Sequence, residues 1–266
     1  MISGLIVYNK VDQDKNSWFV KKCLDGLNDG LFSLIFIEEN AVLDYLKDHE
    51  VDYVIYRARN DKLLEEIERR GIRCFNNHLT NKTANNKYLT YEFLKENNIP
   101  CLESSLNIDD IDSYPIVMKS VDGHGGQEVN LVNSKEEALN IKTMNNKQFI
   151  YQRYIHNKGD MRLYVLNHQV IAAVIRNNKQ DFRSNFSLGG SFSIVEPSQE
   201  IKETAIKISK LLNADYIGVD FLKIGNTYLV NEIEDPVGAR MLYQTSDIDI
   251  ISLFIKRIKD VMNEYL

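Results

Sequence analysis

Short apolar segments alternate with amphipathic segments over the first 80 residues, and this alternation restricts the fold more than any other feature of the chain. The apolar segments are 4–8, 32–37, 51–56 and 72–75, and the segments with apolar residues at helical spacing are 17–27, 40–48 and 61–71. Strands that are joined through helices pair in parallel, because the helix carries the chain back across the sheet. We therefore predict a small parallel α/β domain over residues 1–80.

The rest of the chain favours antiparallel pairing, because its strand-like segments follow one another through short turns. Residues 161–176 predict a hairpin that turns near Asn167 and His168, and residues 216–234 predict another around Gly225 and Asn226. Helices are expected over 81–100, 134–144 and 198–212 and in the tail from residue 247. We expect an α/β (α+β) fold class, with a small subdomain over residues 81–147 and a C-terminal subdomain over residues 148–266.

Charge and cysteine usage limit the classes of partner. The formal net charge is −6 over 266 residues, whereas proteins that bind nucleic acid usually carry a net positive charge or a basic surface. The cysteines Cys23, Cys74 and Cys101 lack metal-ligand spacing, so we interpret them as reduced thiols of a cytoplasmic protein. The first apolar run is too short for a signal peptide, and no run reaches membrane-spanning length. We expect no nucleic-acid partner and no membrane partner.

Three acidic residues stand at the ends of apolar strands. Glu232 and Glu234 point the same way, because side chains alternate along a strand. Asp220 interrupts the apolar run "IGVDFL", where an unpaired charge is costly. A turn with an odd number of residues, centred on Asn226, would pair Asp220 with Glu232, whereas a two-residue turn would put them on opposite faces. We predict the odd turn and a triple-carboxylate site for Mg²⁺; the alternative is a solvated acidic strand end.

A glycine-rich segment follows a strand that ends in lysine. Gly123, Gly125 and Gly126 lie four to seven residues beyond Lys119, and their lack of side chains lets backbone N–H groups approach an anion. A plain hairpin turn is the alternative. Lys119 favours the phosphate site, since a lysine in an apolar strand needs an anionic partner.

Basic and polar side chains form a third group. Asp160 and Arg162 are expected on one strand face, spaced to pair or to share a ligand, and Arg176 ends the returning strand. Arg183 and Asn185 lie in the polar loop that follows. Arginines suit multi-anionic groups because their donors form a fixed fork. The alternative is a surface ion-pair network.

Taken together, these segments resemble the ATP-grasp superfamily, and within it the RimK-like carboxylate–amine ligases. The resemblance covers residues 80–240 and depends on the order and spacing of several motifs. The motifs are "NKYLTYEFLKENNIP", "PIVMK", "DGHGGQEV", "QRYI", "GDMRLYV", "VIAAVIR", "DFRSNFSLGG", "GVDFL" and "NEIEDPVG". The resemblance implies a nucleotide held between two antiparallel sheets, preceded by the small parallel domain.

The resemblance also implies a role for each matching residue. Lys87 and Lys119 would hold the ATP phosphates, and Asp160 the ribose or the edge of the base. Arg176 and Arg183 would stabilise charge at the reacting centre. The backbone at Arg153, Tyr154 and Ile155 would contact adenine, Asn185 would contact phosphate, and Asp220, Glu232 and Glu234 would bind one or two Mg²⁺ ions, which Mn²⁺ could replace.

The sequence departs from the family pattern at a few positions. Arg153 stands where the adenine segment usually has a glutamate, so a carboxylate contact is lost while the backbone contacts remain. Glu234, with Asp235 beside it, stands where the last metal ligand is commonly an asparagine, and the extra charge could tighten Mg²⁺. Arg240 follows in a turn that is usually small and serine-rich, and faces either the acceptor substrate or a structural ion pair.

The implied activity is ATP-dependent ligation of a carboxylate to an amine through an acyl phosphate, with release of ADP and phosphate. The substrates would be small-molecule or peptide carboxylates and amines, and the family resemblance implies that homo-oligomers can form. The main alternative is a nucleotide-binding regulatory module without ligase turnover. A phosphotransferase that stops at a phosphorylated product is a further alternative.

Overall fold

The computed structural model describes residues 1–266 apart from 127, 157–158, 178–190, 226 and 265–266. The N-terminal unit is a parallel sheet in the order β2-β1-β3-β4, as the alternating segments predict. Its strands are β1 (Ile2–Tyr8), β2 (Phe32–Glu38), β3 (Tyr53–Tyr56) and β4 (Arg73–Phe75). Helices α1 (Lys10–Gly26), α2 (Val42–Asp48) and α3 (Asp61–Arg69) connect them, with a 3-10 turn at Glu39–Ala41 before α2.

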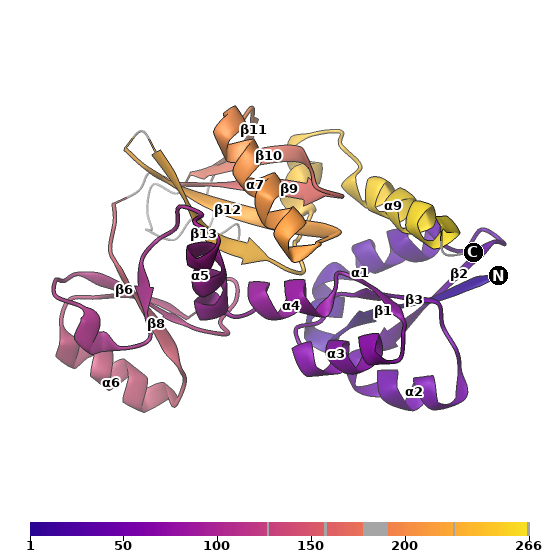
Figure 1. The fold of residues 1–266 in the computed structure, drawn as a ribbon, viewed down its shortest axis with the longest axis horizontal. Coiled ribbons are helices and arrows are strands. Elements are labelled where there is room, and N and C mark those ends of the chain that lie inside the picture. Colours follow the sequence, from indigo (N-terminus) through magenta and orange to yellow (C-terminus); the bar gives the residue numbers. More distant parts are fainter. Residues whose placement is uncertain (127, 157–158, 178–190, 226, 265–266) are drawn as a thin grey trace.

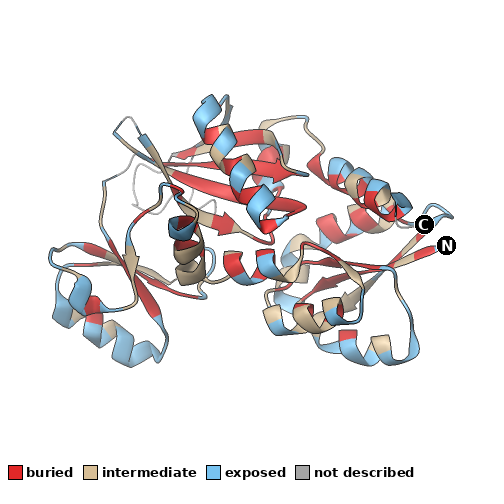
Figure 2. Ribbon diagram, viewed as in Figure 1, coloured by how far each residue is buried: buried red, intermediate tan, exposed pale blue. Residues whose placement is uncertain are grey.

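A large antiparallel sheet forms the centre of the molecule (Figure 1), in the order β11-β10-β9-β12-β13. Its strands are β9 (Asp160–Leu166), β10 (Gln169–Asn177), β11 (Ser191–Val195), β12 (Tyr216–Ile224) and β13 (Thr227–Glu234). Helix α7 (Gln199–Leu212) packs on one face through Ile201, Ala205, Ile208 and Leu212. Figure 2 shows β9 and β12 largely buried, which agrees with their near-continuous apolar sequence, whereas β11 at the edge of the sheet has no buried residue.

A smaller antiparallel sheet stands beside the large one, in the order β5-β8-β6-β7. It consists of β5 (Ser104–Ser105), β6 (Ile116–Ser120), β7 (Val129–Val132) and β8 (Phe149–Arg153), with a 3-10 turn at Ile108–Asp110 and helix α6 (Lys135–Asn145). Since β8 pairs with both β5 and β6, a boundary after residue 147 would separate β8 from its own sheet. We therefore propose that the boundary of this subdomain follows β8.

Two helices join the N-terminal unit to the small sheet. The single helix expected over 81–100 is instead α4 (His78–Ala84) and α5 (Lys87–Glu96). The break lies at Asn85 and Asn86, and the Asn86 side chain accepts hydrogen bonds from the N–H groups of Tyr88 and Leu89. An asparagine that caps a helix in this way favours a new start over continuation.

The chain ends in α8 (Arg240–Thr245) and α9 (Ile250–Glu264), and α9 returns to the N-terminal unit, where it packs beside α1 (Figure 1). Its buried face includes the expected Ile251, Ile255, Ile258 and Met262, in one core with Phe19 of α1. The first and last elements of the chain therefore share a hydrophobic core. Among the helices in the described ranges, none has the length and apolar character that a membrane crossing requires.

Candidate nucleotide and metal site

A cleft lies between the small and the large sheet, and side chains from both line it. The predicted site residues that fall in the described part of the chain all line this cleft: Lys87, Lys119, Arg153, Tyr154, Ile155, Asp160, Arg176, Asp220, Glu232 and Glu234. Arg183 and Asn185 lie outside the described residues. The structure therefore brings together residues that are up to 147 positions apart in the chain.

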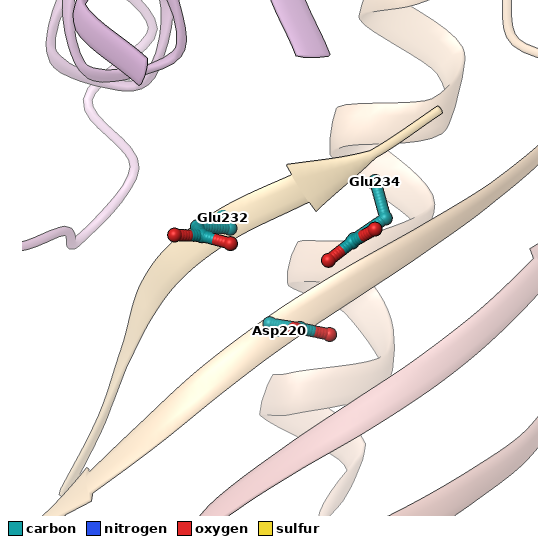
Figure 3. A group of neighbouring side chains, drawn as sticks. All are labelled: Asp220, Glu232 and Glu234. Atoms are coloured by element: carbon teal, nitrogen blue, oxygen red, sulfur yellow. The ribbon is translucent and has the colours of Figure 1, made fainter. Parts of the chain in front are cut away.

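The carboxylates of Asp220, Glu232 and Glu234 converge at one end of the cleft. Each offers an oxygen atom, and these oxygens lie within 4.8 Å of one another. Figure 3 shows Glu232 and Glu234 on one strand and Asp220 on the neighbouring strand. Hard carboxylate oxygens in a cluster are the ligands that Mg²⁺ takes, so the donor set fits that ion.

The pairing of Asp220 with Glu232 has a different origin from the one that the sequence suggested. Ile224 pairs with Thr227, so two residues separate the strands and the prediction of an odd turn is wrong. A β-bulge compensates, because Asp220 pairs with Glu232 while Phe221 pairs with Val230, which leaves Asn231 as an extra residue. A bulge shifts the alternation of side chains by one position, and the acids therefore share a face after all.

Two buried arginines hold the acid cluster. Arg162 donates from Nε to Asp220 Oδ1 and from Nη2 to Asp220 Oδ2, each at 2.7 Å, and from Nη2 to Glu234 Oε1 at 2.7 Å. Arg176 donates to Asp220 Oδ2 at 2.5 Å. Burial raises the pKa of Asp220, but the two guanidinium groups outweigh burial and lower that pKa to about 2. Asp220 is therefore a carboxylate throughout the neutral range.

Asp160 and Arg162 were expected to pair or to share a ligand, and the pairing does not occur. Asp160 instead accepts from Arg176 Nε at 2.5 Å and from Nη2 at 2.6 Å. The reason lies in the register, since Asp160 stands opposite Arg176 on β10 and Arg162 stands opposite Asp220 on β12. Neighbours across a sheet are closer than residues two positions apart in one strand. The prediction that Arg162 pairs with Asp160 was therefore wrong, and the contacts of Arg162 with Asp220 and Glu234 were not predicted.

Lys119 is buried and points across the cleft toward the acid strand. Its Nζ lies 2.9 Å from Asn231 Oδ1 and 3.8 Å from Glu232 Oε1. Burial lowers the pKa of Lys119, while Glu232 counteracts this. Lys87 at the start of α5 donates to the backbone carbonyl of Gly123 in the glycine-rich loop. Two cations therefore stand between the loop and the carboxylates, and such an arrangement of charge suits a polyphosphate.

The other wall of the cleft is apolar. Leu102, Val117, Ile155 and Leu222 line it, together with the buried side chain of Gln152. Arg153, which replaces the usual glutamate, is exposed, and its nearest acid is Asp112 at 3.7 Å. An apolar slot beside a cationic and acidic end suits a ligand with a flat base and a charged chain.

A second cavity continues from Glu232 and Glu234 toward the N-terminal unit. It reaches the carboxyl edge of the parallel sheet, which is the usual ligand-binding edge of such sheets. Its walls include Asp12, Lys15, Arg59, His124 and Arg240. Arg59 pairs with Asp12, whereas Arg240 is exposed and forms no ion pair with another described residue.

Asp235 does not belong to the cluster of Asp220, Glu232 and Glu234. Its side chain is 4% exposed and accepts hydrogen bonds from Asn76 Nδ2 and Asn81 Nδ2, each at 2.9 Å. Burial raises the pKa of Asp235, and the two amides partly offset this. Asp235 therefore belongs to a buried polar knot with Asn76, Asn81 and Arg57, whose guanidinium donates to the carbonyl of Val237 at 2.8 Å. No local sequence pattern predicts this polar cluster, which joins β13 to the N-terminal unit.

We expect Asp235→Ala to lower the free energy of unfolding by about 3 kcal/mol, because one N–H of each of two buried amides loses its acceptor, while the other N–H keeps the carbonyl of Tyr216 or of Ala58. Urea denaturation followed by circular dichroism measures this change. Asp247→Ala, at an exposed position nearby, is the control and should change stability by less than about 0.5 kcal/mol. Equal effects of the two substitutions would contradict the structural role of Asp235.

Comparisons with known proteins agree with this geometry. A family model described as the RimK-like ATP-grasp domain matches residues 84–258. An uncharacterized protein of Mycoplasma genitalium, MG011, is 31% identical, and the match covers 99% of this chain and 94% of that protein. A probable alpha-L-glutamate ligase of Haemophilus influenzae (strain PittEE) is 27% identical, over 74% of this chain and 71% of its own length.

Solved structures give the same fold. The D-alanine–D-alanine ligase of Bacillus anthracis complexed with ATP superposes with a TM-score of 0.74 at 15% identity, covering 98% of this chain and 99% of that one. The ATP-grasp ligase PsnB with its minimal precursor has a TM-score of 0.72 at 17% identity, covering 97% and 98%. Identities this low show the fold alone.

Proposed function

The chain belongs to the RimK-like ATP-grasp family, and from this premise we propose that it is an ATP-dependent ligase that activates a carboxylate as an acyl phosphate and transfers it to an amine. One observation carries the proposal: three convergent carboxylates and two lysines stand in one cleft that continues into a second cavity. A charged end for a triphosphate and a separate space for a substrate are what such a reaction needs.

The reaction consists of two displacements. A carboxylate oxygen attacks the γ-phosphorus of ATP, the bond to the β–γ bridging oxygen breaks, and ADP leaves. The amine nitrogen then attacks the acyl carbon, phosphate leaves with the bonding electrons, and the nitrogen loses a proton. Phosphorylation is needed because a free carboxylate is a poor acylating agent.

The protein mainly positions and neutralises charge in this scheme. Lys87 and Lys119 would hold the phosphates, and Arg176 would stabilise the developing acyl phosphate. Asp220, Glu232 and Glu234 would hold one or two Mg²⁺ ions, which would supply positive charge to the phosphate oxygens. Mn²⁺ prefers the same ligands and could replace Mg²⁺. We also propose that Arg183 and Asn185 act at the reacting centre, that the 153–155 backbone contacts adenine and that Asp160 binds the ribose. Asp160 would then have to share its oxygens with Arg176.

We further propose that the second cavity receives an acidic substrate, such as glutamate or an acidic peptide end. Two observations support this proposal. One relative is described as a probable alpha-L-glutamate ligase. The cavity is also lined by two basic side chains, Lys15 of α1 and Arg240 of α8. The guanidinium group of Arg240 forms no ion pair within the described ranges, so it can donate hydrogen bonds to the carboxylate of a substrate.

Arg240→Gln should raise the KM for the acidic substrate about tenfold, because a charge-assisted hydrogen bond is lost, and should leave the KM for ATP unchanged. Steady-state ADP release with glutamate and glutamate-terminated peptides as probes gives both constants. Arg69→Gln is the control, since Arg69 is exposed on α3 and pairs only with Glu65 within the described chain. An unchanged KM for the acid would remove Arg240 from the substrate site.

Trapping with hydroxylamine tests the ligase itself. With Mg·ATP and a carboxylate probe, an acyl phosphate gives a hydroxamate and one ADP per turnover. Tight ATP binding without ADP release across the probes would favour the regulatory module instead. A phosphotransferase would release ADP and leave a phosphorylated product that does not react with an amine.

A further inference from the structure

The β-bulge in β13 places one additional side chain in the cleft. Val230 and Ile233 both pack in the core that includes α7, and the two residues between them, Asn231 and Glu232, both line the cleft. A strand without a bulge alternates its side chains and would place only one of these two residues on that side. The bulge therefore puts a neutral amide next to one of the three acids.

The added amide holds the buried lysine of the opposite wall. Lys119 Nζ donates to Asn231 Oδ1 at 2.9 Å, and among the described residues this is the only hydrogen bond of that ammonium group. Glu232 Oε1 lies 3.8 Å from the same nitrogen, which is beyond hydrogen-bond distance. The amide therefore satisfies the lysine, while the carboxylate beside it keeps its oxygens free of a hydrogen bond from that lysine.

Without the amide, Lys119 and Glu232 would attract each other strongly. Their side chains are only 9% and 28% exposed, so little water screens the two charges. A direct hydrogen bond between an ammonium group and a carboxylate is about twice as strong as one between neutral groups. A divalent cation would have to break that bond before it could bind Glu232, and the lysine would be less available to a phosphate.

We propose that Asn231 is a positioning residue that keeps Lys119 from bonding directly to Glu232, so that the lysine stays available to phosphate and the carboxylate to a divalent cation. The inference rests on the proposed nucleotide and metal site, and it adds a residue that acts through Lys119. Removal of the amide should let Lys119 Nζ close the distance of 3.8 Å and donate to Glu232 Oε1.

The test measures how available the carboxylate is, without turnover. Binding of Mn²⁺ is followed by electron paramagnetic resonance, with ADP raised to saturation for each variant. Asn231→Leu keeps the size of the side chain but offers no acceptor, and it should raise the dissociation constant of Mn²⁺ about tenfold. In the Lys119→Met background, the same substitution should change this constant by less than about twofold, because no ammonium group remains to compete for Glu232.

Asn130→Leu is the matched control, because Asn130 is a half-buried asparagine on β7 that does not line the cleft. This variant should bind Mn²⁺ as the wild type does. If Asn231→Leu does not fold, Asn231→Ala removes the acceptor without adding an apolar branch and is measured in the same two backgrounds.

Two results would overturn the inference and leave the metal site standing. One is an unchanged dissociation constant when Asn231 is replaced. The other is an equal loss of Mn²⁺ affinity with and without Lys119, because Asn231 would then act on the strand or on the cation and not through the lysine. Absence of Mn²⁺ binding by the wild-type protein with ADP would overturn both the inference and the proposed metal site.

Discussion

Replacing Asp220 by Asn should lower the rate of ADP release by at least about 100-fold. The amide has no charge to offer a divalent cation, and it also removes the partner that Arg162 and Arg176 share. Coupled spectrophotometry of ADP, at saturating ATP and over a range of Mg²⁺ concentrations, measures the loss. We expect that no Mg²⁺ concentration restores the wild-type rate.

Asp215→Asn is the matched control, because Asp215 is also a buried aspartate held by two arginines. Its carboxylate lies 2.6 Å from Arg73 Nη2 and 3.4 Å from Arg257 Nε, just before β12 begins and outside the cleft. This variant should lose stability and keep its rate within about twofold once folded. Normal turnover in Asp220→Asn, or equal inactivation in both variants, would remove Asp220 from the metal site.

Replacing Lys119 by Met should raise the KM for ATP about 100-fold. Methionine matches the four-atom stem of the lysine side chain, but it leaves Glu232 and Asn231 without the ammonium group and the phosphates without a buried cation. Steady-state kinetics together with equilibrium binding of ATP separates a loss of binding from a loss of turnover. Unchanged ATP affinity would make Lys119 a structural residue.

Lys147→Met serves as the control for this variant. Lys147 lies just before β8 of the same small sheet and pairs with Glu128, but it is exposed and does not line the cleft. Exposed ion pairs contribute little, so its KM for ATP should stay within about twofold of the wild type.

Periodicity and residue type were enough to predict the sheets and the convergence of the acids. The acids converge as predicted, but a β-bulge and not an odd turn places Asp220 opposite Glu232. Counting residues between Asp220 and Glu232 cannot distinguish an odd turn from a two-residue turn followed by a bulge, because both shift the alternation by one position. The extra residue, Asn231, has no local sequence signature of a bulge.

Side-chain partners were harder to predict than strands. Asp160 and Arg162 look like a pair in the sequence, yet each pairs with a residue on a neighbouring strand, and that choice depends on register. Asp235 was expected only to add negative charge beside Glu234, and its hydrogen-bond donors are Asn76 and Asn81, more than 150 positions away. Contacts of this kind are set by tertiary packing, on which local sequence gives no information.

The guanidinium groups of Arg162 and Arg176 place positive charge among the acids of the large sheet before any cation binds. They stand against the carboxylates of Asp160, Asp220 and Glu234, so much of the mutual repulsion of the acids is offset without a bound cation. Newly synthesised protein should thus reach its native state in the presence of a chelator, unlike domains that fold only around their ion. Binding of a divalent cation would then be a reversible event that follows folding.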